Sequence, residues 1–534
     1  MADTFDADFV IVGSGVAGAL LAWRLASSGR STLIVEAGPR IDRSDALMRF
    51  FAAPIKHSNS PYPATPWAPS PNEAHIGDYY IQDGPVSFHG TYLRAVGGTT
   101  WHWGGTAQRL YPNDFRMKTA FGVALDWPLT YDDLAPWYDR AEAALGVAGS
   151  RTNSLGPART TDFPLPEIPF TYLDRQVAAV SPAHGLTLGT HPQARNSIDF
   201  DGRPACCGSA SCVPLCPVGA KYDGAVHVAK AETAGARVLD SAVVTRLVPG
   251  DDRRIASLRF RRPDGSEGTV TGRTFIVAAH AIETPKLLLA SRDERAPDGL
   301  ANSSDQLGRN LMGHYQKGFA GIAAKPLYPY RGPVETAGFR EFRDHDKRGE
   351  YAAVGCGLTN EGFSRAIGPL KTAAALAGQG MRGKALDRAI AERTEREFLI
   401  GGSAEMLPDP ANRVRPDFDR LDGGGQPRPR IAFKVADYTL RGLAVTQAKL
   451  RPIVDALGCT QVVELGPVTV TSNIAGTARM GTDPRTSVVD ANLRAHDHPN
   501  LYMVGSAVFP TTGANPPTLT IAALSLRLAS HLAA

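Results

Sequence analysis

The most constraining feature of the sequence is a glycine turn between an apolar run and a helical pattern near the N-terminus. Residues 9–12 are a continuous apolar run, typical of a buried parallel strand, and GSGVAG follows at once. Apolar residues then recur with helical spacing in AGALLAWRLASS. Gly13 permits a tight turn, Gly15 lets backbone N–H groups approach a pyrophosphate, and Gly18 lets the helix pack closely on the strand. This order predicts an α/β dinucleotide-binding fold.

An acid after the second predicted strand supports this interpretation. The segment STLIVEAG reads as a strand that ends at Glu36, about 20 residues beyond the glycines. A carboxylate at that distance is where the ribose of an adenosine needs an acceptor for its hydroxyls. The alternative is a turn that begins a helix and binds no ligand.

Composition limits the classes of protein that remain. A chain of 534 residues predicts two to four domains, as a length prior. Lys plus Arg total 57 against 53 acids, and no basic run carries interleaved aromatics, so we expect no nucleic-acid partner. Acids at Asp3 and Asp6 and an immediate strand argue against a cleavable signal. The last apolar stretch contains Arg527 and predicts a buried amphipathic helix.

Four cysteines gather in one short loop. Cys206, Cys207, Cys212 and Cys216 lie in a segment rich in Gly, Ser and Pro, and a proline follows the last of them. Such spacing favours an iron–sulfur cluster, with zinc or a pair of disulfides as alternatives. Neighbouring cysteines in an extended loop point in different directions, so three ligands are favoured over four.

Four further segments extend the pattern along the chain. They are RAVGGTT from Arg94, AAHAIETPKLLLAS from Ala278, GRNLMGH from Gly308 and VGSAVFPTTGANPPTLTIAAL from Val504. Together with the glycine turn, they resemble the glucose–methanol–choline (GMC) family of FAD oxidoreductases. The pairing of TTWHWGG with the cysteine loop is most similar to bacterial membrane-associated sugar dehydrogenases within that family.

The resemblance implies where the flavin would lie. Gly97 and Gly98 would let backbone lie against the ring, because a Cβ there would push the ring away. His102 stands where some members of the family attach the flavin covalently, although others keep the histidine without a bond, which is the favoured interpretation. The remaining implied cofactor residues are Val244 on the adenine side, Ala279, Gly505 and Ser506.

The resemblance also implies an electron path. Cys206, Cys212 and Cys216 would hold a 3Fe–4S cluster, which passes electrons singly and favours a dehydrogenase over an oxidase. Similar enzymes act with a small chaperone-like subunit that carries the export signal and with a cytochrome c acceptor. We therefore expect a location in the bacterial periplasm or at the periplasmic membrane face through a partner subunit, and in the cytoplasm if no partner exists.

The catalytic segment departs from the family. Members oxidise a hydroxyl by hydride transfer to flavin N5 while a side chain takes the proton. Asn515, before a proline, fits one of the two polar positions, but the usual histidine of the other is Asn473. An amide is not a base near neutral pH. Either His314 or a water takes the proton, or the substrate is already activated, or this copy is weakened or engineered.

Two site candidates have structural alternatives. His314 follows Gly313 where the family usually has an acid, and a histidine bonded to backbone is at least as well supported as a catalytic one. Glu405 could hydrogen-bond a polar substrate. The favoured interpretation is that this acid ties together the turn around Asn412 and Arg413.

The expected architecture is α/β, with a GMC-type Rossmann-like FAD-binding domain and a discontinuous antiparallel-sheet substrate domain. The FAD domain would comprise 1–50, 91–125, 196–315 and 486–534, with the iron–sulfur loop at 204–220; the substrate domain and lid would comprise 51–90, 126–195 and 316–485. The expected activity is an FAD-dependent dehydrogenase for a sugar, glycoside or polyol. The alternatives are an oxidase that uses oxygen and a flavin-holding subunit with weak or no turnover.

Overall fold

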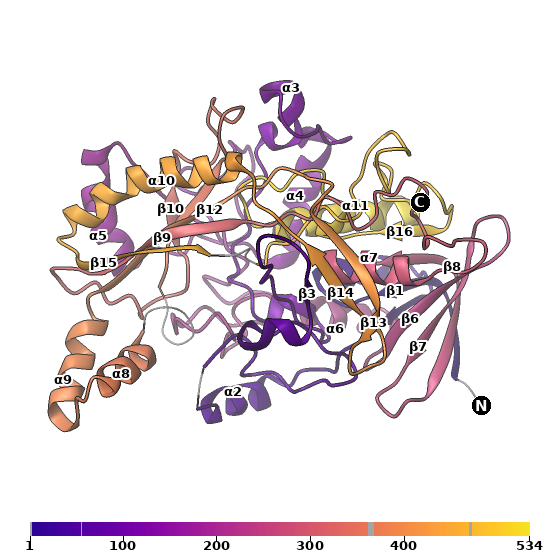
Figure 1. Ribbon diagram of the computed structural model, residues 1–534, viewed down its shortest axis with the longest axis horizontal. Coiled ribbons are helices and arrows are strands. Elements are labelled where there is room, and N and C mark those ends of the chain that lie inside the picture. Colours follow the sequence, from indigo (N-terminus) through magenta and orange to yellow (C-terminus); the bar gives the residue numbers. More distant parts are fainter. Residues whose placement is uncertain (1–2, 55, 361–367, 469–471) are drawn as a thin grey trace.

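The computed structural model describes residues 3–54, 56–360, 368–468 and 472–534. Its two large sheets lie at opposite ends of an elongated molecule (Figure 1). The sheet near the N-terminus is mostly parallel, and the other is antiparallel. This confirms the expected α/β class with a second, antiparallel sheet.

The first sheet has the strand order β5-β2-β1-β8-β7-β6, and β16 also pairs with β8. Its strands are β1 (Asp3–Val12), β2 (Thr32–Val35), β5 (Arg237–Leu239), β6 (Val243–Pro249), β7 (Ile255–Arg261), β8 (Glu267–Val277) and β16 (Leu501–Met503). β1 runs parallel to β2 and β8, so Val12 lies opposite Val35 and Val277. The carboxyl ends of these strands therefore meet at one edge, which is where ligands bind in sheets of this kind.

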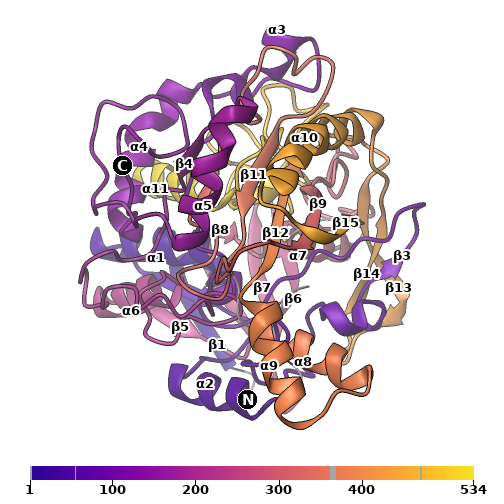
Figure 2. The ribbon, with the colours of Figure 1, turned by 90° about the vertical axis from the view of Figure 1, so that its left-hand side faces the viewer.

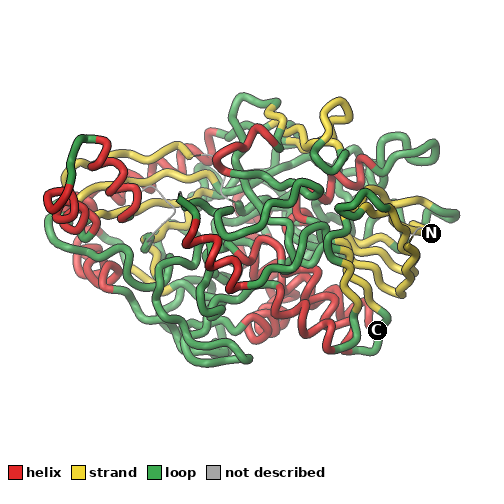
Figure 3. Tube along the Cα trace, turned by 90° about the horizontal axis from the view of Figure 1, so that it is seen from below, coloured by secondary structure: helices red, strands yellow, loops and turns green. Residues whose placement is uncertain are grey.

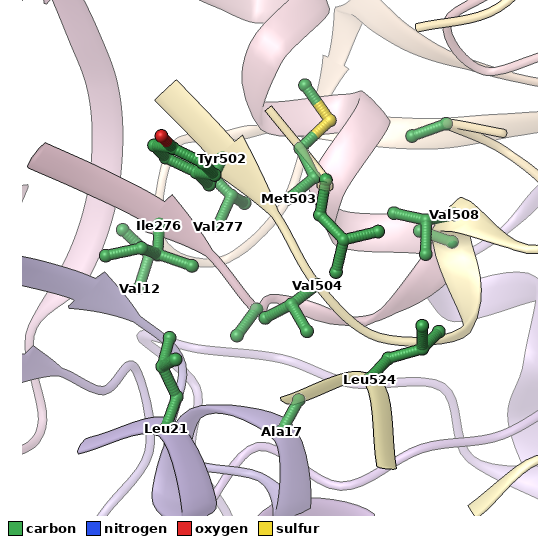
Figure 4. Close-up of a cluster of buried hydrophobic side chains, with 14 of the residues drawn as sticks. Val12, Ala17, Leu21, Ile276, Val277, Tyr502, Met503, Val504, Val508 and Leu524 are labelled. Atoms are coloured by element: carbon green, nitrogen blue, oxygen red, sulfur yellow. The ribbon is translucent and has the colours of Figure 1, made fainter. Parts of the chain in front are cut away.

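Helices cover this sheet and complete its core. They are α1 (Val16–Ser27), α4 (Tyr131–Leu145), α6 (Ala225–Thr233), α7 (His280–Ala290) and α11 (Thr518–Ala533). α1 packs between α6 and the C-terminal α11, and Figure 3 shows helices gathered beside the strands near the C-terminus. Apolar side chains such as Val12, Leu21, Val277, Met503 and Leu524 meet in the core there (Figure 4). In the described part of the chain, no helix combines the length and apolarity needed to span a bilayer.

The second sheet is antiparallel, with the order β15-β9-β12-β11-β10-β4. Its strands are β4 (Leu188–Thr190), β9 (Tyr315–Ile322), β10 (Ala337–Phe339), β11 (Val354–Leu358), β12 (Glu397–Ala404) and β15 (Thr460–Val468). The long helix α10 (Asp437–Ala456) lies across it (Figure 2), and α5 (Tyr172–Val180) packs on α10. Gly355, Gly357, Gly401 and Gly402 line a cavity beside β11 and β12. Such small residues leave room next to the sheet.

A third sheet, in the order β13-β14-β3, joins an early segment to a late one. Its strands are β3 (Ile81–Gln82), β13 (Arg413–Leu421) and β14 (Pro427–Ala432). The remaining α-helices are α2 (Arg43–Ala52), α3 (Met117–Phe121), α8 (Pro369–Gly378) and α9 (Gly383–Thr394). The expected domain division stays a prediction, and residues 1–2, 55, 361–367 and 469–471 of its ranges lie outside the described residues.

Candidate active site

The glycine turn after β1 is built by backbone contacts. Gly13 has φ +100°, in the left-handed region, and a Cβ on it would lie 2.7 Å from the carbonyl oxygen of Ala278. A Cβ on Gly18 would lie 2.0 Å from the carbonyl oxygen of Gly13. By contrast, a Cβ on Gly15 would meet nothing within 4 Å, and Gly15 lines a large cavity. The turn therefore presents open backbone to a ligand.

Glu36 follows β2 directly and lies beside this turn. Its carboxylate accepts hydrogen bonds from Ser14 N at 2.8 Å, Ser14 Oγ at 2.7 Å and Gly38 N at 2.9 Å. Burial raises the pKa of Glu36, while these donors and the charge of Arg94 act in the opposite direction. Glu36 is held at the cavity wall, in the position predicted for a ribose contact, and that contact stays a prediction.

The second glycine pair has two different functions in the fold. Gly98 has φ +61° and lines the cavity, and a Cβ on it would lie 2.8 Å from Cα of Gly15. Gly97 has φ +96°, but its Cβ would instead meet the backbone nitrogen of Ala225 at 2.7 Å, at the start of α6. Gly98 thus faces the cavity as expected, whereas Gly97 is required for close packing against α6.

One cavity of about 840 Å³ connects the two large sheets. It starts at the glycine turn and reaches the strands of the antiparallel sheet. The predicted site residues that line it are Gly13, Gly15, Glu36, Gly98, His102, Val244, Ala279, His314, Asn473, Gly505 and Ser506. Those that do not line it are Gly18, Gly97, Cys206, Cys212, Cys216, Glu405 and Asn515. A Cβ on Gly505, like one on Gly15, would meet nothing within 4 Å. These open cradles fit a flat, extended dinucleotide such as FAD.

His102 is a second indication that a ligand belongs in this cavity. The side chain is buried, and within the described residues its Nδ1 has no hydrogen-bond partner. Burial, with the charge of Lys221, lowers the pKa of His102 to about 4, so the imidazole is neutral at pH 7. A neutral ring nitrogen at the wall can contact a flavin, and covalent attachment stays a prediction.

Asn473 and His314 meet at the far end of the cavity. Asn473 Nδ2 lies 3.0 Å from His314 Nδ1, and His314 Nε2 lies 2.9 Å from the carbonyl oxygen of Gly513. A carbonyl only accepts, so Nε2 carries the proton and Nδ1 accepts the hydrogen bond from Asn473. Burial lowers the pKa of His314 to about 4. The side chain is thus a neutral imidazole beside the amide that replaces the usual histidine.

The other predicted catalytic amide is enclosed. Asn515 is 1% exposed, and its Nδ2 donates to the carbonyl oxygen of Arg109 at 2.7 Å. Its Oδ1 accepts from Arg343 Nη1, which also donates to Gln108 Oε1 at 2.7 Å. Arg343 and His191 line the cavity and escaped the sequence prediction. Neither belongs to a motif, and only the fold brings residues 108, 343 and 515 together.

Glu405 is part of an internal ion cluster. Its Oε2 lies 2.6 Å from Arg348 Nη2, and its Oε1 accepts from Ala353 N at 3.0 Å and from Tyr438 at 2.9 Å. Arg348 also lies 2.7 Å from Asp114. The carboxylate does not line the cavity. It therefore ties α10 to the segment before β11, rather than the turn around residues 412 and 413, and a substrate contact is not part of this arrangement.

None of the cysteine loop's four cysteines lines the cavity, although Val213 between Cys212 and Cys216 does. Cys212 and Cys216 are buried and Cys206 is partly buried, while Cys207 is exposed. Burial raises the pKa of the Cys206 thiol, and the nearby thiols of Cys212 and Cys216 add to this effect. Within the described ranges, no three His, Cys, Asp or Glu side chains are arranged to hold a metal ion. The three predicted ligands do share one loop, and their thiolates are the donors that iron–sulfur clusters use.

A parallel sheet with this glycine turn, and a cavity that runs from it to polar groups on a second sheet, define a dinucleotide-dependent oxidoreductase. Family models agree. Residues 179–316 and 408–525 match GMC oxidoreductase, and residues 11–41 match an NAD(P)-binding Rossmann-like domain.

Comparison with known proteins supports the same family over almost the full length of the chain. The chain is 39% identical to the fructose dehydrogenase large subunit of Gluconobacter japonicus, covering 99% of this chain and 98% of that one. It is 26% identical to 2-methyl-1,2-propanediol dehydrogenase of Mycolicibacterium austroafricanum, covering 98% and 95%. The crystal structure of pyridoxine 4-oxidase from Mesorbium loti superposes with a TM-score of 0.65 at 20% identity, covering 98% and 99%. The chain belongs to the GMC oxidoreductase family, and FAD is the dinucleotide for which its cavity is built.

Proposed function

We propose that the protein is an FAD-dependent dehydrogenase that oxidises a hydroxyl group of a sugar, glycoside or polyol. The observation that carries the proposal is the cavity, which joins the glycine turn to the pair of Asn473 and His314. Bound FAD would supply the hydride acceptor for this oxidation. The fructose dehydrogenase relative and the propanediol dehydrogenase relative support a polyhydroxylated or alcohol substrate.

The protein side chains would position the hydroxyl and receive its proton. Asn473 donates to His314 Nδ1, and the bond from His314 Nε2 to Gly513 keeps the imidazole in one tautomer. With a pKa of about 4, His314 is unprotonated at neutral pH and keeps a basic lone pair on Nδ1. Rotation of the Asn473 amide would expose this lone pair. His314 is therefore our assignment for the proton acceptor, with a bound water as the alternative.

Electron exit is the second part of the proposal. Cys206, Cys212 and Cys216 would hold an iron–sulfur cluster, and this group would supply one-electron transfer to an external acceptor. A relative named as a large subunit supports a multi-subunit enzyme. We accordingly propose a small chaperone-like subunit and a cytochrome c as partners, with a periplasmic location through the former, or a cytoplasmic one if no such partner exists.

Anaerobic mixing of the purified flavoprotein with sugars and polyols tests the proposed reaction. Bleaching of the oxidised flavin by one of these compounds, followed by faster reoxidation with a dye or cytochrome than with air, is the expected result. Bleaching followed by rapid peroxide formation in air would instead establish an oxidase. That second candidate is favoured by relatives named oxidases, such as 6'''-hydroxyparomomycin C oxidase of Streptomyces lividus at 29% identity.

Two further measurements separate the remaining alternatives. Iron and acid-labile sulfide should be present in the native protein and fall in Cys206→Ser, while Cys207→Ser is the matched control. A flavin-holding subunit without turnover is the third candidate, and it rests on Asn473. It would be established if no alcohol bleached the native flavin and Asn473→His created activity.

A further inference from the structure

Among the described residues that line the cavity, Arg343 is the cation with no carboxylate at ion-pair distance. Four Lys or Arg side chains line the cavity in the described part of the chain: Arg94, Lys286, Lys317 and Arg343. Arg94 pairs with Glu283, Lys286 with Glu283 at 2.8 Å, and Lys317 with Glu464 at 3.3 Å. Arg343 has no carboxylate within 4 Å among these described residues, although it is only 3% exposed. Burial of an unpaired charge is costly.

The hydrogen bonds of Arg343 use only one of its three nitrogens. Nη1 donates to the amide oxygens of Gln108 and Asn515. Nε finds no acceptor in the described residues, and Nη2 makes no hydrogen bond to them either. Nε and Nη2 share one edge of the planar guanidinium. Nε has almost no accessible surface, so Nη2 is the donor that a ligand in the cavity can reach, and a carboxylate would make a charge-assisted hydrogen bond with it.

The surroundings hold this side chain against the antiparallel sheet. A Cβ on Gly355 of β11 would lie 2.5 Å from the carbonyl oxygen of Ala514 and 3.3 Å from Nη1 of Arg343, so glycine lets both the loop and the guanidinium approach the strand. Arg343 also bonds Asn515, two residues beyond the Gly513 carbonyl that anchors His314. Arg343 and the proposed proton acceptor His314 are thus held by the same short loop.

We propose that Arg343 is a specificity-determining residue that binds a carboxylate of the substrate, so that the preferred substrates are sugar acids of the aldonic or uronic class. The inference rests on the proposed function, because it names the substrate of the same site. A neutral sugar hydroxyl could accept a hydrogen bond from Nη2, but it would bring no negative charge into contact with this buried cation, on which the carboxylates of Glu335 and Asp114 act from farther away.

Matched acids and amides test this inference on the FAD-loaded enzyme. D-gluconate and D-glucuronate are compared with D-gluconamide and D-glucuronamide, which keep the hydroxyls and lose the charge. We expect anaerobic flavin reduction with a kcat/KM about 10- to 100-fold higher for the acids, from the strength of a charge-assisted hydrogen bond. Arg343→Gln should abolish the preference and Arg343→Lys should keep part of it.

Gln108→Leu is the matched control, since it removes a partner of Nη1 but leaves the guanidinium in place. If its preference for acids disappears as well, or if native enzyme reduces acid and amide equally, the inference is wrong. If the Arg343→Gln variant loses FAD, the comparison of acid and amide substrates with the native enzyme still tests the inference. Titration of the native enzyme with the acid, followed by flavin absorbance, distinguishes the proposed carboxylate site from the proposed dehydrogenase activity. Tight binding of the acid without any flavin reduction would sustain the carboxylate site and contradict the proposed dehydrogenase.

Discussion

The two ends of the cavity are specified by different kinds of contact. At the nucleotide end, backbone atoms of Gly13, Gly18 and Ala278 approach so closely that no side chain fits between them. At the substrate end, side chains from distant segments hold one another, as His314 and Asn473 do across 159 positions of sequence. The glycines of the nucleotide end can be recognised as a motif in the sequence. The side-chain contacts of the substrate end can be recognised only in the folded chain.

Gly18→Ala should have the largest effect, because it breaks the backbone contact on which the nucleotide end depends. The new Cβ would lie 2.0 Å from the Gly13 carbonyl oxygen, where no flexible side chain can yield. We expect complete loss of bound FAD and a strongly lowered Tm, measured by flavin absorbance and thermal unfolding.

Gly15→Ala is the control for that substitution. Gly15 has φ −61°, which alanine adopts without strain, and its Cβ would project into open space. The Tm of the apoprotein should change little, while the affinity for FAD falls because the methyl group occupies the cradle. Equal losses of stability in the two variants would show that the turn, and not the specific contact at Gly18, is the sensitive element.

Glu405→Gln tests the interpretation of the substrate end as a framework of internal contacts. The buried Arg348 would lose one of the three carboxylates within 4 Å of it, and breaking a buried pair costs about 3–5 kcal/mol of unfolding free energy. KM should stay unchanged, since Glu405 does not line the cavity.

Asp455→Asn is the matched exposed pair, with Arg451 at 2.9 Å, and should cost about 1 kcal/mol or less. Denaturant unfolding and steady-state kinetics measure both variants. If Glu405→Gln raised KM and left stability unchanged, Glu405 would have to contact the substrate, and the structural interpretation would be wrong.

The nucleotide end could be predicted from the sequence more fully than the substrate end. The strand, turn and helix of residues 9–27 could be predicted because apolar periodicity and the need for glycine are local properties. The family motifs placed His314 and Asn473 in the same site. Arg343 and Gln108 could not be found, since they lie on loops and acquire their function from a partner more than 150 positions away. The close approach of Gly97 to Ala225 could likewise not be predicted, because the two residues are distant in sequence.

His314→Gln tests whether the substrate end supplies the base that takes the proton of the hydroxyl group. Glutamine can still donate to Gly513 and meet Asn473, but it cannot take a proton at neutral pH. We expect kcat to fall about 100-fold, the lower part of the range for a positioned base, because a water can replace it partly. FAD content and Tm should be retained.

A loss of bound flavin in parallel with kcat would mean that His314 is a structural histidine. Asn473→His in the His314→Gln background provides a positive control, because it restores a base at the usual position of the family. Recovery of at least part of the lost rate is the expected result.

The smallest expected effect is a loss of unfolding free energy at acidic pH. A buried histidine near each end of the cavity should contribute a similar amount to it. His227 of α6 packs against Trp23 of α1 and is buried with Nδ1 3.0 Å from the Tyr222 hydroxyl, and burial lowers its pKa to about 3. The ordinary pKa of about 6.5 holds in the unfolded chain, which therefore takes up a proton first as the pH falls. Stability is complete above pH 6.5 and declines between pH 6.5 and 3.

For His227 alone, this linkage costs about 2 kcal/mol at pH 5 relative to pH 7. The variant His227→Gln should lose correspondingly less stability between these two pH values, measured by denaturant unfolding at each. His314, with a pKa of about 4, contributes a similar amount at the other end. An unchanged pH dependence in His227→Gln would mean that this histidine is solvated in the folded protein.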